Sequence, residues 1–238
     1  MGLFTFKHSL VKSGILHGKT DIHCHLLPGV DDGSPDLEHT LDLLSFMSEL
    51  GYKELWFTPH VMHGMGNTAA HLRSVFDAFL PYYKGDLKIN LASEYMMDEG
   101  FEERLTTDPL PLGKDHLLVE TSYMYPPSNL EDILLNVWNQ HYKPLIPHPE
   151  RYMYMEEEDY WYFHDKGYEF QLNLMSLSGY YGGRAKYVAE ELLMKDYYDF
   201  VGSDLHHLER YQSMLMSLKL TTKQLDKLEQ LLENNSTI

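Results

Sequence analysis

The sequence predicts an α/β fold, a distorted seven-stranded (βα)7 barrel of the TIM type, from its alternating pattern, its length and its composition. Seven strand-like runs alternate with helical patterns at about thirty residues per unit, which is typical of parallel strands joined by right-handed crossovers. The 238 residues and the 43% hydrophobic content are enough for one large core. The units follow one another without an obvious break, which favours one closed barrel over two domains. An open doubly wound sheet has the same periodicity and stays an alternative.

The expected strands are short runs rich in strand-forming residues. We place them at residues 20–27, 53–59, 88–95, 116–121, 143–148, 168–173 and 199–205.

The helical patterns between these strands carry start signals of their own. Ser34 and Pro35 are expected as the N-cap and the first residue of one helix. Ser128 followed by Glu131 predicts a capping box at the start of another. Further helices are expected at residues 68–83, 156–166, 184–195 and 221–233.

We expect a single domain over residues 1–238, with residues 1–19 as an N-terminal extension and residues 233–238 as a flexible tail. The N-terminus lacks the apolar run and the cleavage site of a signal peptide, and no stretch approaches eighteen apolar residues. The only cysteine is Cys24, which excludes an internal disulfide and favours a reducing compartment. We therefore expect a cytoplasmic protein without membrane insertion.

The charge balance narrows the class of partner. The chain has 19 basic and 36 acidic residues, a net charge of −17 with histidine neutral. Nucleic acids and anionic membranes require clustered lysine and arginine, so neither is expected as the main partner. The oligomeric state does not follow from the sequence.

The metal-capable side chains fall where the expected strands end. His23 and His25 close the first strand, and the two-residue period of a strand places them on one face. Because the carboxyl ends of barrel strands build the active site, the convergence of nine such residues there predicts a metal centre. The other seven are Asp32, His60, Glu94, Glu120, His148, Asp204 and His206.

Histidine and carboxylate ligands without thiolate suit Mn²⁺, Zn²⁺ or Fe²⁺. The four carboxylates contribute four negative charges, so one or two divalent ions leave the site neutral or negative. Three ions leave it at plus two, which suits a phosphate monoester dianion. The four are Asp32, Glu94, Glu120 and Asp204.

Arg151 is the arginine adjacent to a candidate ligand, His148, and its planar guanidinium suits bidentate binding of phosphate oxygens. The alternative for Arg151 is a salt bridge with Glu150 or with the acidic run at 156–159. Cys24 is not expected as a phosphatase nucleophile, because that chemistry requires an arginine six residues on. That position is Val30, so Cys24 is expected as a small buried hydrophobe.

With these residues identified, the chain resembles the PHP (polymerase and histidinol phosphatase) superfamily, and more closely the bacterial protein-tyrosine phosphatases of the CpsB/YwqE type. The matching stretches follow the family order over residues 20–210. They are DIHCHLLPGVDDGS (21–34), FTPH (57–60), LASEY (91–95), LLVE (117–120), PHPERY (147–152) and VGSDLHHLER (201–210).

The resemblance implies a distorted barrel that holds three divalent ions, commonly Mn²⁺, with Fe²⁺ or Zn²⁺ as alternatives. The implied ligands are His23, His25, Glu94 and Asp204 for the first ion, Glu94, Glu120 and His148 for the second, and Asp32, His60 and His206 for the third. Arg151 matches the phosphate-binding arginine of the family, and Arg210 matches a second one. The candidate catalytic residues are Arg151, Asp204 and His60.

The activity that the resemblance implies is metal-dependent hydrolysis of phosphotyrosine on a bacterial tyrosine kinase linked to capsule or exopolysaccharide synthesis. We expect attack by a metal-bridging hydroxide, because neighbouring ions lower the pKa of a shared water, while Arg151 takes up charge on the phosphoryl oxygens. One alternative is a PHP phosphoesterase for a small molecule such as histidinol phosphate. A metal amidohydrolase is disfavoured, because Glu120 stands where that class often has a carboxylated lysine. An inactive docking protein is disfavoured by the complete ligand set.

Overall fold

The parallel sheets that the sequence predicts are present in the computed structural model, which describes residues 6–107 and 109–238. One sheet has the order β10-β9-β8-β7-β6-β4 and the other β2-β3-β5, and all neighbours in both are parallel. The strands of the smaller sheet are β2 (Thr20–Cys24), β3 (Glu54–Phe57) and β5 (Lys88–Leu91). Those of the larger sheet are β4 (His60–Val61), β6 (Glu94–Met96), β7 (His116–Glu120), β8 (Lys143–Pro147), β9 (Glu169–Asn173) and β10 (Phe200–Gly202).

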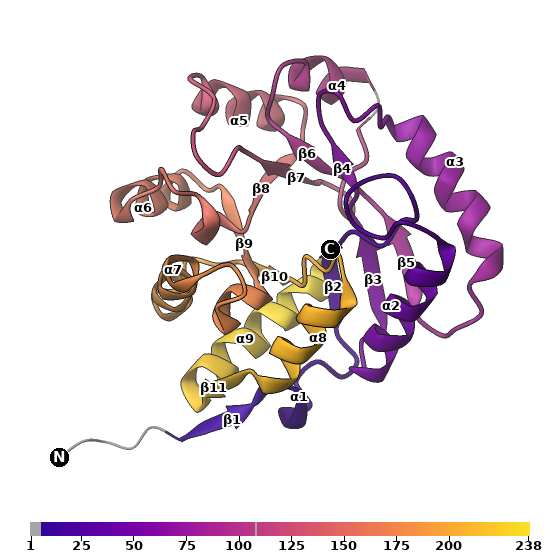
Figure 1. The fold of residues 1–238 in the computed structure, drawn as a ribbon. Coiled ribbons are helices and arrows are strands. Elements are labelled where there is room, and N and C mark those ends of the chain that lie inside the picture. Colours follow the sequence, from indigo (N-terminus) through magenta and orange to yellow (C-terminus); the bar gives the residue numbers. More distant parts are fainter. Residues whose placement is uncertain (1–5, 108) are drawn as a thin grey trace.

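The two sheets meet at two borders. At one border the His25 amide donates to Leu205 O over 2.9 Å and the Asp204 amide to His23 O over 2.8 Å, so β2 lies beside the segment that follows β10. At the other border the chain itself runs from β3 into β4 and from β5 into β6, and the Glu94 amide donates to Pro59 O over 3.2 Å. Figure 1 shows the strands around the middle of the molecule and helices outside them. The α/β class with parallel strands is confirmed. The strand pairing gives two parallel sheets, and their closure into one seven-stranded barrel stays a prediction.

The helices occupy the predicted intervals and, besides the short helix at Leu10–Ser13, two further intervals that were not predicted. The helices at predicted places are α2 (Leu37–Glu49), α3 (Ala69–Phe79), α5 (Leu130–Asn139), α6 (Glu157–Asp165), α7 (Gly183–Met194) and α9 (Thr222–Asn234). The additional ones are α4 (Phe101–Thr107) and α8 (Leu208–Ser217). Single 3-10 turns are η1 (Leu80–Tyr82), η2 (Pro149–Arg151), η3 (Leu174–Ser178) and η4 (Asn235–Thr237). No helix in the described part of the chain has the length and apolar character needed to cross a membrane.

Two predicted helix starts are wrong by one or two residues. The N-cap of α2 is Asp36, whose side chain accepts from the His39 amide over 2.9 Å. Ser34 is buried and donates to Asp36 O over 3.0 Å, so its hydroxyl braces the loop before the helix instead of capping it. The capping box expected from Ser128 does not form, because α5 begins after Asn129 without a side-chain cap.

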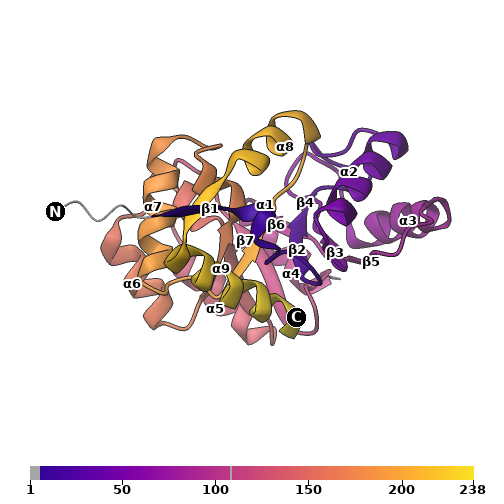
Figure 2. The same cartoon turned by 90° about the horizontal axis from the view of Figure 1, so that it is seen from below.

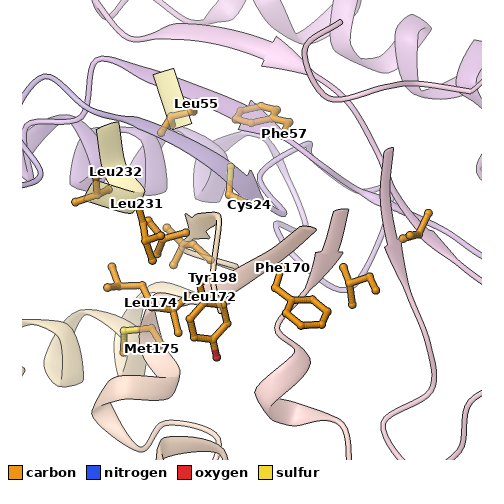
Figure 3. Packing of buried hydrophobic residues seen from close by; sticks show 14 of the residues in the cluster. Cys24, Leu55, Phe57, Phe170, Leu172, Leu174, Met175, Tyr198, Leu231 and Leu232 are labelled. Carbon is orange, nitrogen blue, oxygen red and sulfur yellow. The ribbon is translucent and has the colours of Figure 1, made fainter. Parts of the chain in front are cut away.

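The core between the sheets and the surrounding helices draws on segments far apart in the sequence. Figure 3 shows part of it, with Leu231 and Leu232 of α9 near Leu172 of β9 and Leu174 of η3. Cys24 belongs to this core: it is fully buried, and its thiol donates to Trp56 O over 3.2 Å. Burial raises the pKa of the thiol well above its ordinary value, which supports a hydrophobic role and not a nucleophilic one.

The N-terminal segment packs onto the C-terminal part of the chain. Strand β1 (Lys7–Ser9) pairs antiparallel with β11 (Lys219–Thr221), and α1 (Leu10–Ser13) follows it directly. Leu10 is fully buried. Residues 7–13 of the expected N-terminal extension are therefore part of the fold, and residues 1–5 lie outside the described residues.

The flexible tail expected at residues 233–238 is wrong, because α9 and η4 continue almost to the end of the chain. Figure 2 shows α9 lying across the molecule as seen from below. Asn235 is 1% exposed, and its Nδ2 donates to Thr20 O of β2 over 2.8 Å and to Val201 O of β10 over 2.7 Å. Its Oδ1 accepts from the Val201 amide over 3.2 Å. One side chain thus bridges the border between the two sheets.

We predict that Asn235→Ala lowers the free energy of unfolding by about 3 kcal/mol, because it leaves three buried backbone groups without partners. Urea denaturation measures this directly. The matched control is Ser236→Ala, an exposed neighbour whose hydroxyl bonds only to Glu233 O, with an expected change within about 0.5 kcal/mol. Equal, small effects of both substitutions would show that the chain end does not hold this border together.

Candidate metal centre

His23 and His25 form the inner part of the site. Both are fully buried, and their Nε2 atoms lie 3.1 Å apart. The opposite ring nitrogens face acceptors: His23 Nδ1 lies 2.6 Å from Gln171 Oε1, and His25 Nδ1 lies 2.8 Å from Asp31 Oδ2. With both Nδ1 atoms donating, two Nε2 lone pairs point at one another, an arrangement that requires a proton or a cation between them.

Glu94 lies in the middle of the histidines. Its Oε2 is 3.4 Å from His23 Nε2, 3.3 Å from His25 Nε2 and 3.1 Å from His60 Nδ1. Its Oε1 is 3.0 Å from His148 Nε2. The side chain is fully buried, so this negative charge has no access to water.

Asp204 and Asp32 stand at two other edges of the cluster. Asp204 Oδ1 is 3.4 Å from both His23 Nε2 and His25 Nε2. Asp32 Oδ1 is 3.6 Å from His60 Nε2 and 3.5 Å from His206 Nε2. Glu120 completes the cluster, with Oε1 at 3.0 Å from His60 Nδ1 and Oε2 at 3.8 Å from His148 Nε2.

The structure therefore brings all nine predicted residues together, in groups that differ in part from the expected ligand sets. The groups with donor atoms within 4.8 Å of one another are His25, Asp32, His60 and His206; His23, His25 and Asp204; His23, Glu94 and His148; and His60, Glu94 and Glu120. In the expected second set, Glu120 and His148 share one ion, whereas here they fall in separate groups joined by Glu94.

Divalent cations fit this cluster, because several of its buried polar atoms make no hydrogen bond. These atoms are His60 Nδ1, Glu94 Oε2, Glu120 Oε1 and His148 Nδ1. Buried polar atoms without partners are costly and rare. Imidazole nitrogens and carboxylate oxygens are donors that Mn²⁺, Fe²⁺ and Zn²⁺ accept.

The pKa shifts in the cluster also show that its buried carboxylates require positive charge close to them. Burial acts to raise the pKa of Glu94 and of Asp204, but the imidazoles, His23 first, hold both well below the ordinary value. Burial and His25 act to lower the pKa of His60, but Glu94 and Glu120 raise it to about 9. The histidine protons occupy the place of a cation, so metal binding releases protons and weakens at acid pH.

Backbone strain coincides with two candidate ligands. His148 has φ of 40° and Asp204 has φ of 50°, both in the left-handed region that non-glycine residues seldom adopt. Each follows a strand, and each is held there by a backbone hydrogen bond of 2.8 Å, from the His148 amide to Gln171 O and from the Asp204 amide to His23 O. The turns direct both side chains back over the strand ends.

Arg151 lies beside the cluster in a cavity of about 310 Å³ lined by ligand candidates and tyrosines. Its Nη1 donates to Asp204 Oδ2 over 2.7 Å, and its guanidinium lies 4.4 Å from the ring centre of Tyr123 and 4.0 Å from that of Tyr181. The alternative of a salt bridge to Glu150 is wrong. The buried Glu150 carboxylate accepts instead from the Asn173 amide, the Ser176 hydroxyl and the Tyr198 hydroxyl.

Arg210 is not brought to this cavity. It is exposed on α8, its guanidinium lies 4.6 Å from the ring centre of Tyr180, and its Nη2 donates to Tyr180 O over 3.2 Å. Its role as a second phosphate-binding arginine stays a prediction.

Sequence reasoning missed the residues that orient the candidate ligands. Gln171 supports His23, and Asn173 Nδ2 donates to Asp204 Oδ2 over 2.7 Å. Both lie on β9 as buried polar residues two positions apart, and their alternation with the apolar Phe170 and Leu172 was the available signal. Tyr181 carried no such signal, because its loop has no strand period.

The fold and the site define an α/β protein with clustered histidines and carboxylates at the carboxyl ends of parallel strands. The chain belongs to the family described as capsular polysaccharide synthesis, CpsB/CapC, whose model matches residues 19–237. The resemblance indicated by the sequence motifs is thereby confirmed.

Two named relatives and one solved structure are similar to this chain. Tyrosine-protein phosphatase YwqE of Bacillus subtilis (strain 168) is 27% identical over 197 residues, 79% of this chain and 78% of the relative. Tyrosine-protein phosphatase CpsB of Streptococcus pneumoniae is 27% identical over 204 residues, 79% of this chain and 83% of the relative. A chain from crystal structures of YwqE and CpsB, described as unique metal-dependent tyrosine phosphatases, matches with a TM-score of 0.75 and 26% identity. The match covers 90% of this chain and 94% of that chain.

We predict that metal ions stabilise the folded protein and that His148→Ala removes part of this effect. Mn²⁺ at about one hundred times its dissociation constant adds about 2.7 kcal/mol per site, which raises the melting temperature of chelator-treated protein by about 5–10 °C. Differential scanning calorimetry and elemental analysis measure the two quantities. His71→Ala, an exposed histidine on α3, is the control and keeps both the metal content and the shift. Identical metal content in His148→Ala and wild type would contradict the assignment of His148.

Proposed function

We propose that this protein is a metal-dependent phosphomonoesterase that hydrolyses phosphotyrosine on a bacterial tyrosine kinase linked to capsular or exopolysaccharide synthesis. The observation that carries the proposal is Arg151, whose guanidinium lies beside a buried cluster of metal-capable donors in a cavity lined by tyrosines. The relatives named as tyrosine phosphatases and the family described by capsular polysaccharide synthesis support the substrate and the process.

The proposed cofactor is a set of three divalent ions, with Mn²⁺ first and Fe²⁺ or Zn²⁺ as alternatives. Glu94 would be shared, because its two oxygens face different histidines. Bound ions would act as Lewis acids and make water a competent nucleophile near neutral pH. The residues proposed to hold them are His23, His25, Asp32, His60, Glu94, Glu120, His148, Asp204 and His206.

Arg151 is proposed to bind the phosphoryl group. Only its Nη1 is engaged with Asp204, so the remaining N–H groups in the guanidinium plane are available to phosphoryl oxygens. They hold the group in place and stabilise the negative charge that develops on it. Asp204 links this arginine to His23 and His25, so substrate and cofactor sites share one carboxylate.

The leaving group needs little assistance from a proton donor. A phenol has a pKa of about 10, far below that of an alkyl alcohol, so its oxyanion leaves more readily. We assign no general acid. This difference favours aryl phosphates over small alkyl phosphates such as histidinol phosphate, in line with the relatives.

We further propose that the parallel strands form one seven-stranded barrel, in which β3 and β4 together make one barrel strand and β5 and β6 together make another. We also propose that residues 1–238 form one domain. The bonds between β2 and the segment after β10, and the Asn235 bridge, support this closure. We propose a cytoplasmic location, because a single buried cysteine suits a reducing compartment. There the protein would meet the phosphotyrosine segment of the kinase.

The first test is hydrolysis of para-nitrophenyl phosphate and a phosphotyrosine peptide by chelator-treated protein, before and after addition of Mn²⁺. We expect activity only with metal. Arg151→Ala is expected to lower kcat/KM by about a hundredfold, because it removes charge stabilisation of the transferred group. His148→Ala is expected to abolish activity, and His71→Ala is the control that retains it.

Two results would redirect the assignment. Hydrolysis of histidinol phosphate with no activity on the peptide would favour the small-molecule phosphoesterase. Full metal occupancy without hydrolysis of any phosphomonoester would reject the reaction while leaving the metal centre in place.

A further inference from the structure

Two tyrosine rings lie against the Arg151 guanidinium. Tyr123, from the segment after β7, lies 4.4 Å from the guanidinium carbon, and Tyr181, from the segment between η3 and α7, lies 4.0 Å from it. Aromatic faces attract a guanidinium placed over them, and more strongly where water is excluded. The Arg151 side chain is 15% exposed, so this contact is largely sheltered from solvent.

We call the pair Tyr123 and Tyr181 the Arg151 clamp, and both of its rings are held in place by neighbouring residues. The Met153 amide donates to Tyr123 O over 2.7 Å, which ties the Tyr123 segment to the residues just after Arg151. Tyr180 packs edge-on against Tyr181, with ring centres 4.9 Å apart and planes at 70°. The clamp is therefore a built arrangement and not two independent surface side chains.

Tyr181 also reaches the carboxylate that Arg151 binds. Asp204 Oδ2 accepts from Arg151 Nη1 over 2.7 Å, from Asn173 Nδ2 over 2.7 Å and from the Tyr181 hydroxyl over 3.2 Å. The other oxygen, Oδ1, faces the histidines of the cluster. Three donors on Oδ2 thus set which way the carboxylate turns.

The contacts with the two tyrosines fix the orientation of the Arg151 guanidinium. A guanidinium has all five N–H groups in one plane, and the central carbon of this plane lies over the rings of Tyr123 and Tyr181. Phosphoryl oxygens accept from N–H groups along the edge of the plane, and Arg151 lines the cavity that also contains His60, Glu94 and His148. Tyr123, Tyr180 and Tyr181 line the same cavity.

Building on the proposed function, we propose that Tyr181 and Tyr123 are positioning and specificity residues. They hold the Arg151 edge toward the phosphoryl group, and their rings form the walls against which the phenyl ring of an aryl phosphate packs. The occupant is therefore an aryl phosphomonoester in preference to an alkyl one.

A binding cycle tests the positioning without relying on catalysis. Calorimetry with inorganic phosphate and Mn²⁺-loaded protein compares wild type, Tyr181→Leu, Arg151→Ala and the double variant. We expect about tenfold weaker binding for Tyr181→Leu and no further loss when it is added to Arg151→Ala, because Tyr181 acts through that arginine. Tyr181→Phe keeps the ring and stays within about threefold of wild type. Tyr187→Leu, the same kind of substitution at a 65% exposed position on α7, leaves binding unchanged.

The specificity is tested with phosphotyrosine and phosphoserine peptides of otherwise identical sequence. The ratio of their kcat/KM values is expected to fall about tenfold in Tyr181→Leu and in Tyr123→Leu, because a phenyl ring loses a wall that a serine side chain does not use. Tyr187→Leu keeps the ratio of the wild type. Metal content measured on the same samples is expected to stay constant.

The outcomes separate the clamp from the proposed reaction. Additive losses of phosphate binding in the double variant overturn the positioning role, and an unchanged peptide ratio overturns the specificity role. If wild type binds phosphate but hydrolyses neither peptide, the proposed function fails, and the binding cycle still decides whether Tyr181 positions Arg151.

Discussion

The arrangement of this molecule depends on one carboxylate that water cannot reach. Glu94 is fully buried between the imidazoles of four histidines that come from three separate parts of the chain. A charge in that position is tolerated only with opposite charge close to both of its oxygens. The other residues of the site either supply this positive charge or hold the residues that supply it.

The histidines at the strand ends supply the positive charge near Glu94. Neutral and acidic neighbours hold these histidines and Asp204 in position. Gln171 and Asp31 fix the rings of His23 and His25, and Asn173 and Tyr181 fix the orientation of Asp204. Outer partners of this type set the ring orientation and the basicity of metal ligands. The strained turns at His148 and Asp204 are held by the same network, since their amides bond to Gln171 O and His23 O.

Local sequence patterns predicted the features that depend on neighbouring residues alone, above all the strands. Each of the seven predicted intervals contains a strand, because apolar runs and two-residue alternation are local signals. The short strand β4 was not predicted, and the interval 88–95 contains two strands, β5 and β6. Helices α4 and α8 were missed, since neither follows a clear start signal. The cap at Ser34 was wrong because its hydroxyl donates to the Asp36 carbonyl, a partner that the geometry of the loop selects. The cap at Ser128 was wrong because α5 begins one residue later, after Asn129.

What depends on contacts across the chain could not be predicted in this way. The partner of Arg151 is 53 residues away at Asp204 and not the neighbouring Glu150, which is directed into the interior. Arg210 shares a motif with the ligands, yet the turn of α8 places it against Tyr180. The division of Glu120 and His148 between two groups likewise requires the positions of β7 and β8 in space.

The bridge made by Asn235 has a consequence for the order in which the molecule can be assembled. The first parallel strand carries His23, yet the side-chain amide that joins it to β10 belongs to Asn235, 215 residues after Thr20. A nascent chain therefore cannot make this bridge until Asn235 has been synthesised, long after β2. Contacts of such long sequence separation also form slowly. The candidate metal centre draws His23 and Asp204 from the two sides of the border that Asn235 bridges, so it is among the last parts of the protein to reach its final geometry. A chain that stops before residue 235 would lack the side chain that bridges its first and last parallel strands.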